Sequence, residues 1–189
     1  MENKILKIIT IENKQDAKFL RKKTADFDPA LLKDKKKAGE ITELIKQMRK
    51  IMTGAIGVGL SANQLGLNLR LFVAQIRATK LRSVNSIASE DQKFYAIFNP
   101  EIVKASKEKS LLEEGCLSVP GYYGEVERPE KITLVGQDRY GKKVKIKAWG
   151  LLAKVFQHEV DHLNGILFID KAKNIQKIEA KKSPPISRI

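Results

Sequence analysis

The sequence predicts one domain that combines helices with antiparallel strands, and three segments carry that prediction. Residues 40–52 and 150–163 place apolar side chains at the spacing of one helix face. Between them, apolar residues alternate on both sides of a turn at 138–141, which predicts an antiparallel hairpin. The chain has 189 residues, and no repeat or linker divides it. A single core is therefore expected.

Composition excludes several classes of protein. No apolar run is long enough to cross a bilayer, and the first ten residues lack the apolar stretch and cleavage site of a secretory signal. We therefore expect a cytoplasmic protein without a membrane partner. The chain has one cysteine, Cys116, which excludes an intramolecular disulfide.

The net charge of +14 is concentrated towards the two ends of the chain. Residues 14–50 hold twelve basic and six acidic side chains, and residues 171–189 hold six and one, whereas residues 111–170 are close to neutral with eight and nine. A basic surface attracts polyanions such as RNA, although a solvated lysine-rich surface has the same composition. We therefore expect a domain over residues 1–170 followed by a basic C-terminal tail over 171–189.

The first predicted elements are helical. A weak helical pattern around residues 16–23 precedes a stronger one at 40–52, where Gly54 is placed to end the helix. The apolar residues of the second helix share one face: Ile41, Leu44, Ile45, Met48, Ile51 and Met52. That face is expected to pack on the core.

The middle of the chain predicts strands. Alternation at 69–73 and an aromatic-rich run at 94–98 indicate two of them, the second ended by Asn99-Pro100. Residues 77–92 between these strands are polar and aperiodic, which predicts a long surface loop. The two arms of the hairpin then follow, with alternating apolar residues: Ile132, Leu134, Val144, Ile146 and Ala148.

The last predicted helix, 150–163, contains the motif H-E-x-x-H as His158-Glu159-Val160-Asp161-His162. Two imidazoles four residues apart can reach one metal ion, and the carboxylate beside them can serve a bound water as a general base. The alternative is a helix whose histidines are hydrogen-bonded polar groups without a metal. These two histidines are the only ones in the chain, and their spacing favours the metal site.

A catalytic metal site of this kind needs a third protein ligand and an open position. Cys116 is the candidate, and Gly115 before it would let the backbone approach the ion closely. A lone cysteine is also compatible with a small buried apolar residue. A further segment, 57–64, has closely spaced glycines and offers Gln64 as an amide donor, but it lacks the lysine of a phosphate-binding loop.

Three segments of the chain resemble, in order, the motifs of peptide deformylase: G-x-G-L-A-A-x-Q, E-G-C-L-S and Q-H-E-x-D-H-L-x-G. They are Gly-Val-Gly-Leu-Ser-Ala-Asn-Gln at 57–64, Glu-Gly-Cys-Leu-Ser at 114–118 and Gln-His-Glu-Val-Asp-His-Leu-Asn-Gly at 157–165. The resemblance implies an α+β fold in which the metal-binding helix packs among antiparallel β-sheets. It also implies that residues 1–170 form a metal-dependent hydrolase that removes the N-formyl group from the formyl-methionine of nascent polypeptides and releases formate.

Residue roles follow from the same resemblance. Glu159 is expected to carry the proton, and Gln64 with the backbone N–H of Leu117 to donate hydrogen bonds to the oxygen that becomes negative. The expected ligands of one divalent metal ion are Cys116, His158 and His162. The resemblance favours Fe²⁺ in the cell, and Zn²⁺, Ni²⁺ or Co²⁺ also suit one thiolate and two imidazoles.

Substrate contacts are expected around these groups. The predicted substrate-binding residues are Val58, Gly59, Leu60, Gly115, Tyr123, Leu151 and Val155, of which the aliphatic ones would form an apolar pocket for the methionine side chain. Two positions depart from the family pattern. Ser61 replaces the first alanine of the glycine-rich motif, a small-for-small exchange expected to be without effect. Tyr123 stands where many members carry an arginine that holds the substrate backbone.

Two other functions fit parts of the sequence. A zinc peptidase with H-E-x-x-H takes a downstream glutamate as its third ligand, and only Glu179 in the lysine-rich tail follows. An RNA- or ribosome-associated basic protein with a structural metal site fits the charge. Its aromatic residues, however, are not interleaved with the basic runs, and a fourth protein ligand is missing. The partners we expect are N-formyl-methionyl peptides and, through the basic surface, the ribosome.

Overall fold

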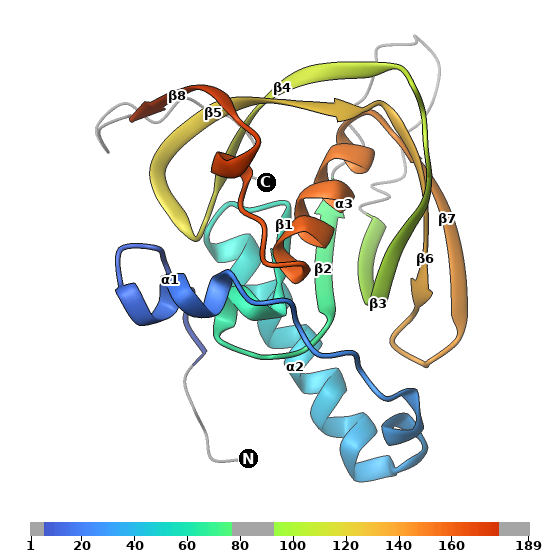
Figure 1. Cartoon of the computed structure of the whole chain (residues 1–189). Helices are drawn as coiled ribbons and strands as arrows, with labels where there is room; N and C mark the ends of the chain where they lie inside the picture. Colours follow the sequence, from blue (N-terminus) through green and yellow to red (C-terminus); the bar gives the residue numbers. More distant parts are fainter. Residues whose placement is uncertain (1–5, 77–92, 178–189) are drawn as a thin grey trace, which may run out of the picture.

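Antiparallel strands surround one buried helix in the computed structural model, which describes residues 6–76 and 93–177 (Figure 1). The helices are α1 (Lys14–Leu20), α2 (Lys35–Gly54) and α3 (Gly150–Leu163), with short 3-10 helices η1 (Pro29–Lys33), η2 (Ala62–Leu65) and η3 (Phe168–Asp170). The strands are β1 (Gly59–Ser61), β2 (Leu71–Ile76), β3 (Lys93–Ala105), β4 (Lys109–Cys116), β5 (Val119–Pro129), β6 (Lys131–Gln137), β7 (Lys143–Trp149) and β8 (Lys173–Lys177).

The strands form two antiparallel sheets. One sheet has the order β1-β2-β3-β6-β7, and the other has the order β4-β5-β8. The helix α3 packs against the first sheet and also contacts β5 of the second. The predicted α+β class, with the histidine-bearing helix among antiparallel sheets, is confirmed.

Two of the three apolar core clusters formed by the described residues lie on either side of β1 and β2. The first joins α3 to the five-stranded sheet and includes Phe72, Leu134 and Phe156. The second joins α2 to the same strands, and α2 contributes Ile45, Met48 and Met52 at helical spacing. The helix α3 is therefore held in place by burial along most of its length.

The hairpin and the last helix lie where the sequence predicts them. The turn at 138–141 joins β6 to β7, and α3 spans the predicted 150–163. The helix α2 starts at Lys35, before the expected residue 40, because the Asp34 side chain caps it by accepting a hydrogen bond from Lys37 N at 2.9 Å.

The expected strand end at Asn99-Pro100 is wrong, because β3 continues to Ala105. The pairing of β3 with β6 shifts register between Phe98 and Glu101, so the proline lies in a bulge, where a ladder hydrogen bond is not required. Asn99 adopts a left-handed backbone with φ 47°, and its side chain bonds the backbone of Phe27.

Two further expectations concern the loop and the tail. The predicted loop at 77–92 lies outside the described residues. Part of the expected tail is ordered: β8 pairs with β5, and Lys171 donates to Asp161 at 2.7 Å. Among the helices that the structure describes, none has the length and apolarity needed to cross a membrane.

Candidate metal centre

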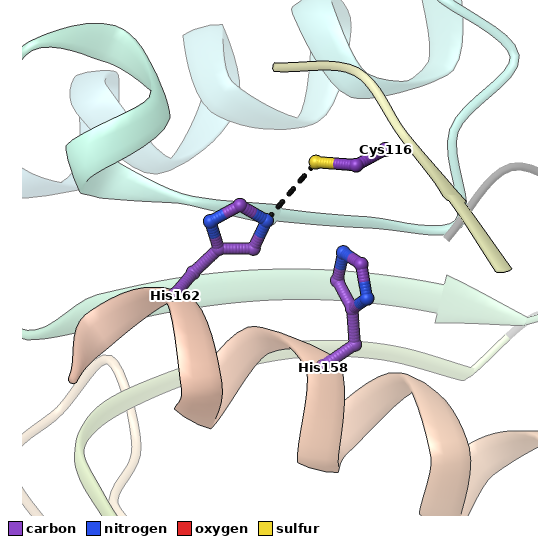
Figure 2. Close-up of side chains that lie close together, drawn as sticks. All are labelled: Cys116, His158 and His162. Atoms are coloured by element: carbon purple, nitrogen blue, oxygen red, sulfur yellow. Dashed lines mark hydrogen bonds between the residues drawn. The ribbon is translucent and has the colours of Figure 1, made fainter. Parts of the chain in front are cut away.

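A strand of the three-stranded sheet and the helix α3 bring three ligand atoms together. Cys116 ends β4, just before the turn into β5, and both histidines project from α3 (Figure 2). The Cys116 Sγ atom lies 3.1 Å from His162 Nε2. The ligand atoms of Cys116, His158 and His162 all lie within 4.8 Å of one another, and all three residues are buried. One thiolate and two imidazoles at this spacing fit a divalent metal ion.

The unpaired nitrogens of the cluster support that fit. Among the described residues, His158 Nε2 is buried and has no hydrogen-bond partner. The other ring nitrogen of this residue, Nδ1, lies 2.9 Å from Glu114 Oε2. A carboxylate can only accept, so Nδ1 carries the proton and Nε2 keeps its lone pair for a metal ion.

Glu114 is part of a buried charge network behind the ligands. Arg128 donates to both of its oxygens, at 2.5 and 2.8 Å, and also to Asp161 at 2.7 Å. Burial alone would raise the pKa of Glu114, but the hydrogen bonds from Arg128 and His158 lower it to about 2. The carboxylate thus stays charged and fixes the orientation of the His158 ring.

The two histidines of the cluster have pKa values that are shifted in opposite directions. Burial lowers the pKa of His158, but hydrogen bonds and charges of Cys116 and Glu114 outweigh it and raise that pKa to about 10. The same surroundings would favour a metal cation bound at Nε2 in place of that proton. Burial, together with the charges of His158 and Arg128, holds the pKa of His162 well below its usual value, which keeps its imidazole neutral and able to ligate.

Glu159 lies beside the ligands and is fully enclosed. Ser61 Oγ donates to its Oε2 at 2.5 Å. Burial raises the pKa of Glu159 to about 7, although the charge of His158 and the Ser61 hydrogen bond act in the opposite direction. A carboxylate with a pKa near neutrality can both accept and release a proton.

Ser61, expected from the sequence to be a small-for-small exchange without effect, contacts Glu159 directly. Both side chains are buried, and the hydroxyl also lies 3.1 Å from the Glu159 carbonyl. Gly59, the first residue of β1, also lies against this carboxylate. A Cβ at this position would overlap the Glu159 carboxylate, so the position requires glycine. The glycine-rich segment therefore holds the position of the carboxylate in addition to supplying Gln64.

The amide of Gln64 points its donor end at the thiol. Its Oε1 accepts from Ser61 N at 2.8 Å, and its Nε2 lies 3.3 Å from Ser118 Oγ and 3.6 Å from Cys116 Sγ. Leu117 follows the cysteine in the turn between β4 and β5. Both expected donors of hydrogen bonds thus lie next to the ligand cluster.

The expected substrate-binding residues divide between different environments. Val58, Leu151 and Val155 belong to the cluster around α3, whereas Leu60 is fully buried in the cluster around α2. Tyr123 is paired with Gly115, and a Cβ on that glycine would lie 2.7 Å from the tyrosine ring. The close packing of the Tyr123 ring therefore explains why residue 115 is a glycine, without any reference to a metal ion.

The roles of Arg128 and Asp161 in this network were not predicted from the sequence, although Asp161 is a fixed position of the Q-H-E-x-D-H-L-x-G motif. Their charges meet only because β5 and α3 pack together, and local spacing carries no information on that contact. Glu179, the third ligand that a peptidase would require, lies outside the described residues.

Comparison with protein families identifies chains similar to this one. The family model described as "Polypeptide deformylase" matches residues 5–178. A peptide deformylase of Halothermothrix orenii is 45% identical over 152 residues, which cover 78% of this chain and 90% of that protein. One of Rhizobium meliloti is 44% identical over 138 residues, covering 73% and 74%.

Solved structures show the same similarity. A probable peptide deformylase from Synechococcus phage S-SSM7 superposes with a TM-score of 0.71 at 38% identity, covering 88% of this chain and 99% of that one. A class I type b peptide deformylase from Acinetobacter baumannii, with Met-Ala-Ser bound, superposes with a TM-score of 0.73 at 30% identity, covering 88% and 98%.

Proposed function

Because the chain belongs to the polypeptide deformylase family, whose members remove the N-formyl group from nascent polypeptides, we propose that Cys116, His158 and His162 hold the catalytic metal ion. The observation that carries this proposal is the buried cluster of three ligand atoms within 4.8 Å. When bound, the ion polarises the formyl group and makes a water nucleophilic near neutral pH. The protein supplies the proton transfers and the orientation of the substrate.

Glu159 is the proposed proton carrier. It accepts the proton of the attacking water and delivers it to the amine nitrogen that leaves, so that formate and a free amino terminus result. Its pKa of about 7 and its hydrogen bond from Ser61 support this role. Gln64 and the Leu117 backbone N–H are the proposed donors to the formyl oxygen as it gains negative charge.

The methionine side chain is proposed to lie against Val58, Leu151 and Val155. These aliphatic residues belong to the cluster beside α3, the helix that carries Glu159. The Acinetobacter relative holds Met-Ala-Ser, a peptide that begins with the same residue. Leu60, which packs on α2, is proposed to support this pocket from behind, and Gly59, Gly115 and Tyr123 to border the peptide backbone.

A metal titration tests the proposed site. Protein stripped with a chelator should release no formate from formyl-Met-Ala-Ser, and added Ni²⁺ should restore release linearly up to one ion per chain. Formate release by the stripped protein, or a break well above one ion per chain, would contradict a single catalytic site.

Replacing Ser61 by alanine should change the pH dependence of turnover. The hydroxyl stabilises the Glu159 carboxylate, so its removal raises the pKa of Glu159 further and moves the acid limb of the kcat profile to higher pH. We expect several-fold slower turnover below neutral pH, unchanged metal content and near-parent turnover at alkaline pH. Superimposable profiles of the two proteins would show that Ser61 does not act on Glu159.

We propose Fe²⁺ as the metal ion in the cell. A thiolate with two imidazoles binds Fe²⁺, Zn²⁺, Ni²⁺ or Co²⁺, and availability decides among them. The Fe²⁺ form should lose activity in air as iron and the Cys116 thiolate oxidise, whereas the Ni²⁺ form should persist. Equal lifetimes of the two forms, measured by formate release, would argue against this pairing of iron with Cys116.

The ribosome, and with it the cytoplasm, is the proposed setting, because nascent polypeptides are the substrate. Part of the basic C-terminal segment contributes to the fold through Lys171 and β8, so a truncation should start after Lys177. It removes three basic and one acidic side chain. Co-sedimentation with ribosomes at low salt should weaken while turnover of free peptides is kept. Unchanged co-sedimentation would assign these residues to the solvated surface.

A further inference from the structure

The outer side of the β6–β7 hairpin is strongly basic. Lys143, Lys145 and Lys147 are exposed and alternate along β7 with residues that pack on the core. Successive residues of a strand point to opposite faces, so these three cations stand in a row about 7 Å apart. The sheet separates this row from α3 and the metal ligands, and β7 lies on the outside of the molecule in Figure 1.

An exposed tryptophan ends this row. Trp149 is 70% exposed and is the only tryptophan of the chain. It pairs directly across the sheet with Lys131, and both line a hollow of about 690 Å³ that also contains Lys104, Lys145 and Lys147. None of the described residues that line this hollow is acidic.

An exposed tyrosine stands at the other end of β7. Tyr140 is 72% exposed, and the Arg139 guanidinium lies 4.8 Å from the centre of its ring. Both residues line a second hollow of about 610 Å³, which shares Lys145 with the first and also includes Val144 and Ile146 on the core side of β7. The acidic residue there, Asp138, accepts hydrogen bonds from the backbone of the turn. Exposed cations and aromatic rings therefore occur together on the turn at 138–141 and along the outer side of β7.

The charge of this surface is uncompensated. In the part of the chain that the structure describes, Lys131, Lys143, Lys145 and Lys147 form no ion pair and no side-chain hydrogen bond. Residues 131–149 hold six basic side chains and one acidic side chain. The near-neutral balance of residues 111–170 hides this excess, because eight of the nine acidic residues of that range lie outside the hairpin.

Protection of a sheet edge explains only part of this pattern. β7 is an edge strand, and lysines on edge strands prevent unwanted pairing. That role does not require Lys131 and Lys104, which lie on the inner strands β6 and β3, and it does not explain an exposed tryptophan. Cations that contact phosphates, combined with rings on which bases stack, are typical of surfaces that bind single-stranded nucleic acid.

We propose that this hairpin face binds single-stranded RNA. We define the face by Lys131, Tyr140, Lys143, Lys145, Lys147 and Trp149. The lysines contact phosphates, and the two exposed rings stack on unpaired bases. The choice of RNA rests on the proposed function, because a nascent polypeptide is met at the ribosome. Binding there leaves the metal centre accessible, since the two lie on opposite sides of the sheet.

The first measurement uses the metal-loaded full-length protein and a short oligouridylate at low salt. Trp149 is the only tryptophan, so stacking of a base on it should quench the intrinsic fluorescence. The dissociation constant should rise steeply with salt concentration. Binding without quenching, or no binding at low salt, would overturn the proposal.

Matched charge variants locate the site. Replacing Lys143, Lys145 and Lys147 by glutamine should weaken binding at least about tenfold and reduce the log–log salt slope by about 2, since each lost phosphate contact removes about 0.7. The control replaces three exposed lysines near or on α2, Lys33, Lys36 and Lys50, which removes the same charge. Equal weakening in both triple variants would show a response to net charge alone and overturn the proposal.

A variant of the ring tests the role of stacking. Trp149→Ala should weaken binding about tenfold, whereas Trp149→Phe should keep most of it, measured by the anisotropy of labelled oligouridylate.

Phosphatidylglycerol vesicles form the competing arm, and tighter binding to vesicles than to RNA would overturn the proposal in favour of a membrane surface. All variants are assayed for formate release. Peptide turnover near the parent level in the lysine and ring variants would show that these variants fold. RNA binding by a parent protein that releases no formate would contradict the proposed function but not the RNA-binding proposal.

Discussion

Replacing Glu159 by glutamine is expected to lower kcat for formyl-Met-Ala-Ser by about 10²–10⁴-fold, the usual contribution of a positioned general base. The amide is nearly isosteric but cannot accept the proton of the attacking water. The three proposed metal ligands are untouched, so the variant should retain one metal ion per chain. Formate release and metal content, measured on the same preparation, separate loss of proton transfer from loss of the ion.

The matched control for this variant is Glu113→Gln. Glu113 is an exposed carboxylate on β4, the strand that carries Cys116. Its replacement by glutamine should leave kcat unchanged. Turnover of Glu159→Gln near the parent level would show that another group moves the proton.

Replacing Cys116 by alanine is expected to abolish both metal binding and turnover. Its thiolate is one of the three proposed ligands, and partners that only orient a ligand already contribute about 10- to 100-fold to metal affinity. Loss of the ligand itself should exceed that range. After gel filtration the variant should contain far less than one ion per chain, whereas the parent keeps its ion.

Glu179→Ala is the control that separates the two metal-site hypotheses. A zinc peptidase site would take Glu179 as its third ligand, so that variant would release the ion and Cys116→Ala would keep it. The deformylase site predicts the reverse. Retention of a full equivalent of metal by Cys116→Ala would refute the proposed ligand set.

Local patterns in the sequence predicted the elements whose signals lie within one segment. The spacing of His158, Glu159 and His162 places all three on the buried side of α3, and helical periodicity with a stop at 164–165 fixed the bounds of that helix. The β6–β7 hairpin followed from alternation around a four-residue turn. These features depend on contacts between neighbours in the sequence.

Features that depend on distant contacts could not be predicted in this way. Arg128 reaches Glu114 and Asp161 only after β5 has paired with β4 and packed on α3. Ser61 looked interchangeable with alanine, because its hydrogen bond to Glu159 spans 98 positions of the chain. The basic hairpin face was missed for a related reason: strand alternation sorts its lysines to one side, and a charge count along the chain averages them with acidic residues elsewhere.

The most direct test of the central claim compares two substrates that differ only in the acyl group. Metal-loaded protein should release formate from formyl-Met-Ala-Ser in proportion to the free amino termini formed, and it should leave acetyl-Met-Ala-Ser intact. Cleavage of an internal peptide bond, or no formate from the formylated peptide at full metal occupancy, would contradict the assignment of this site to deformylation.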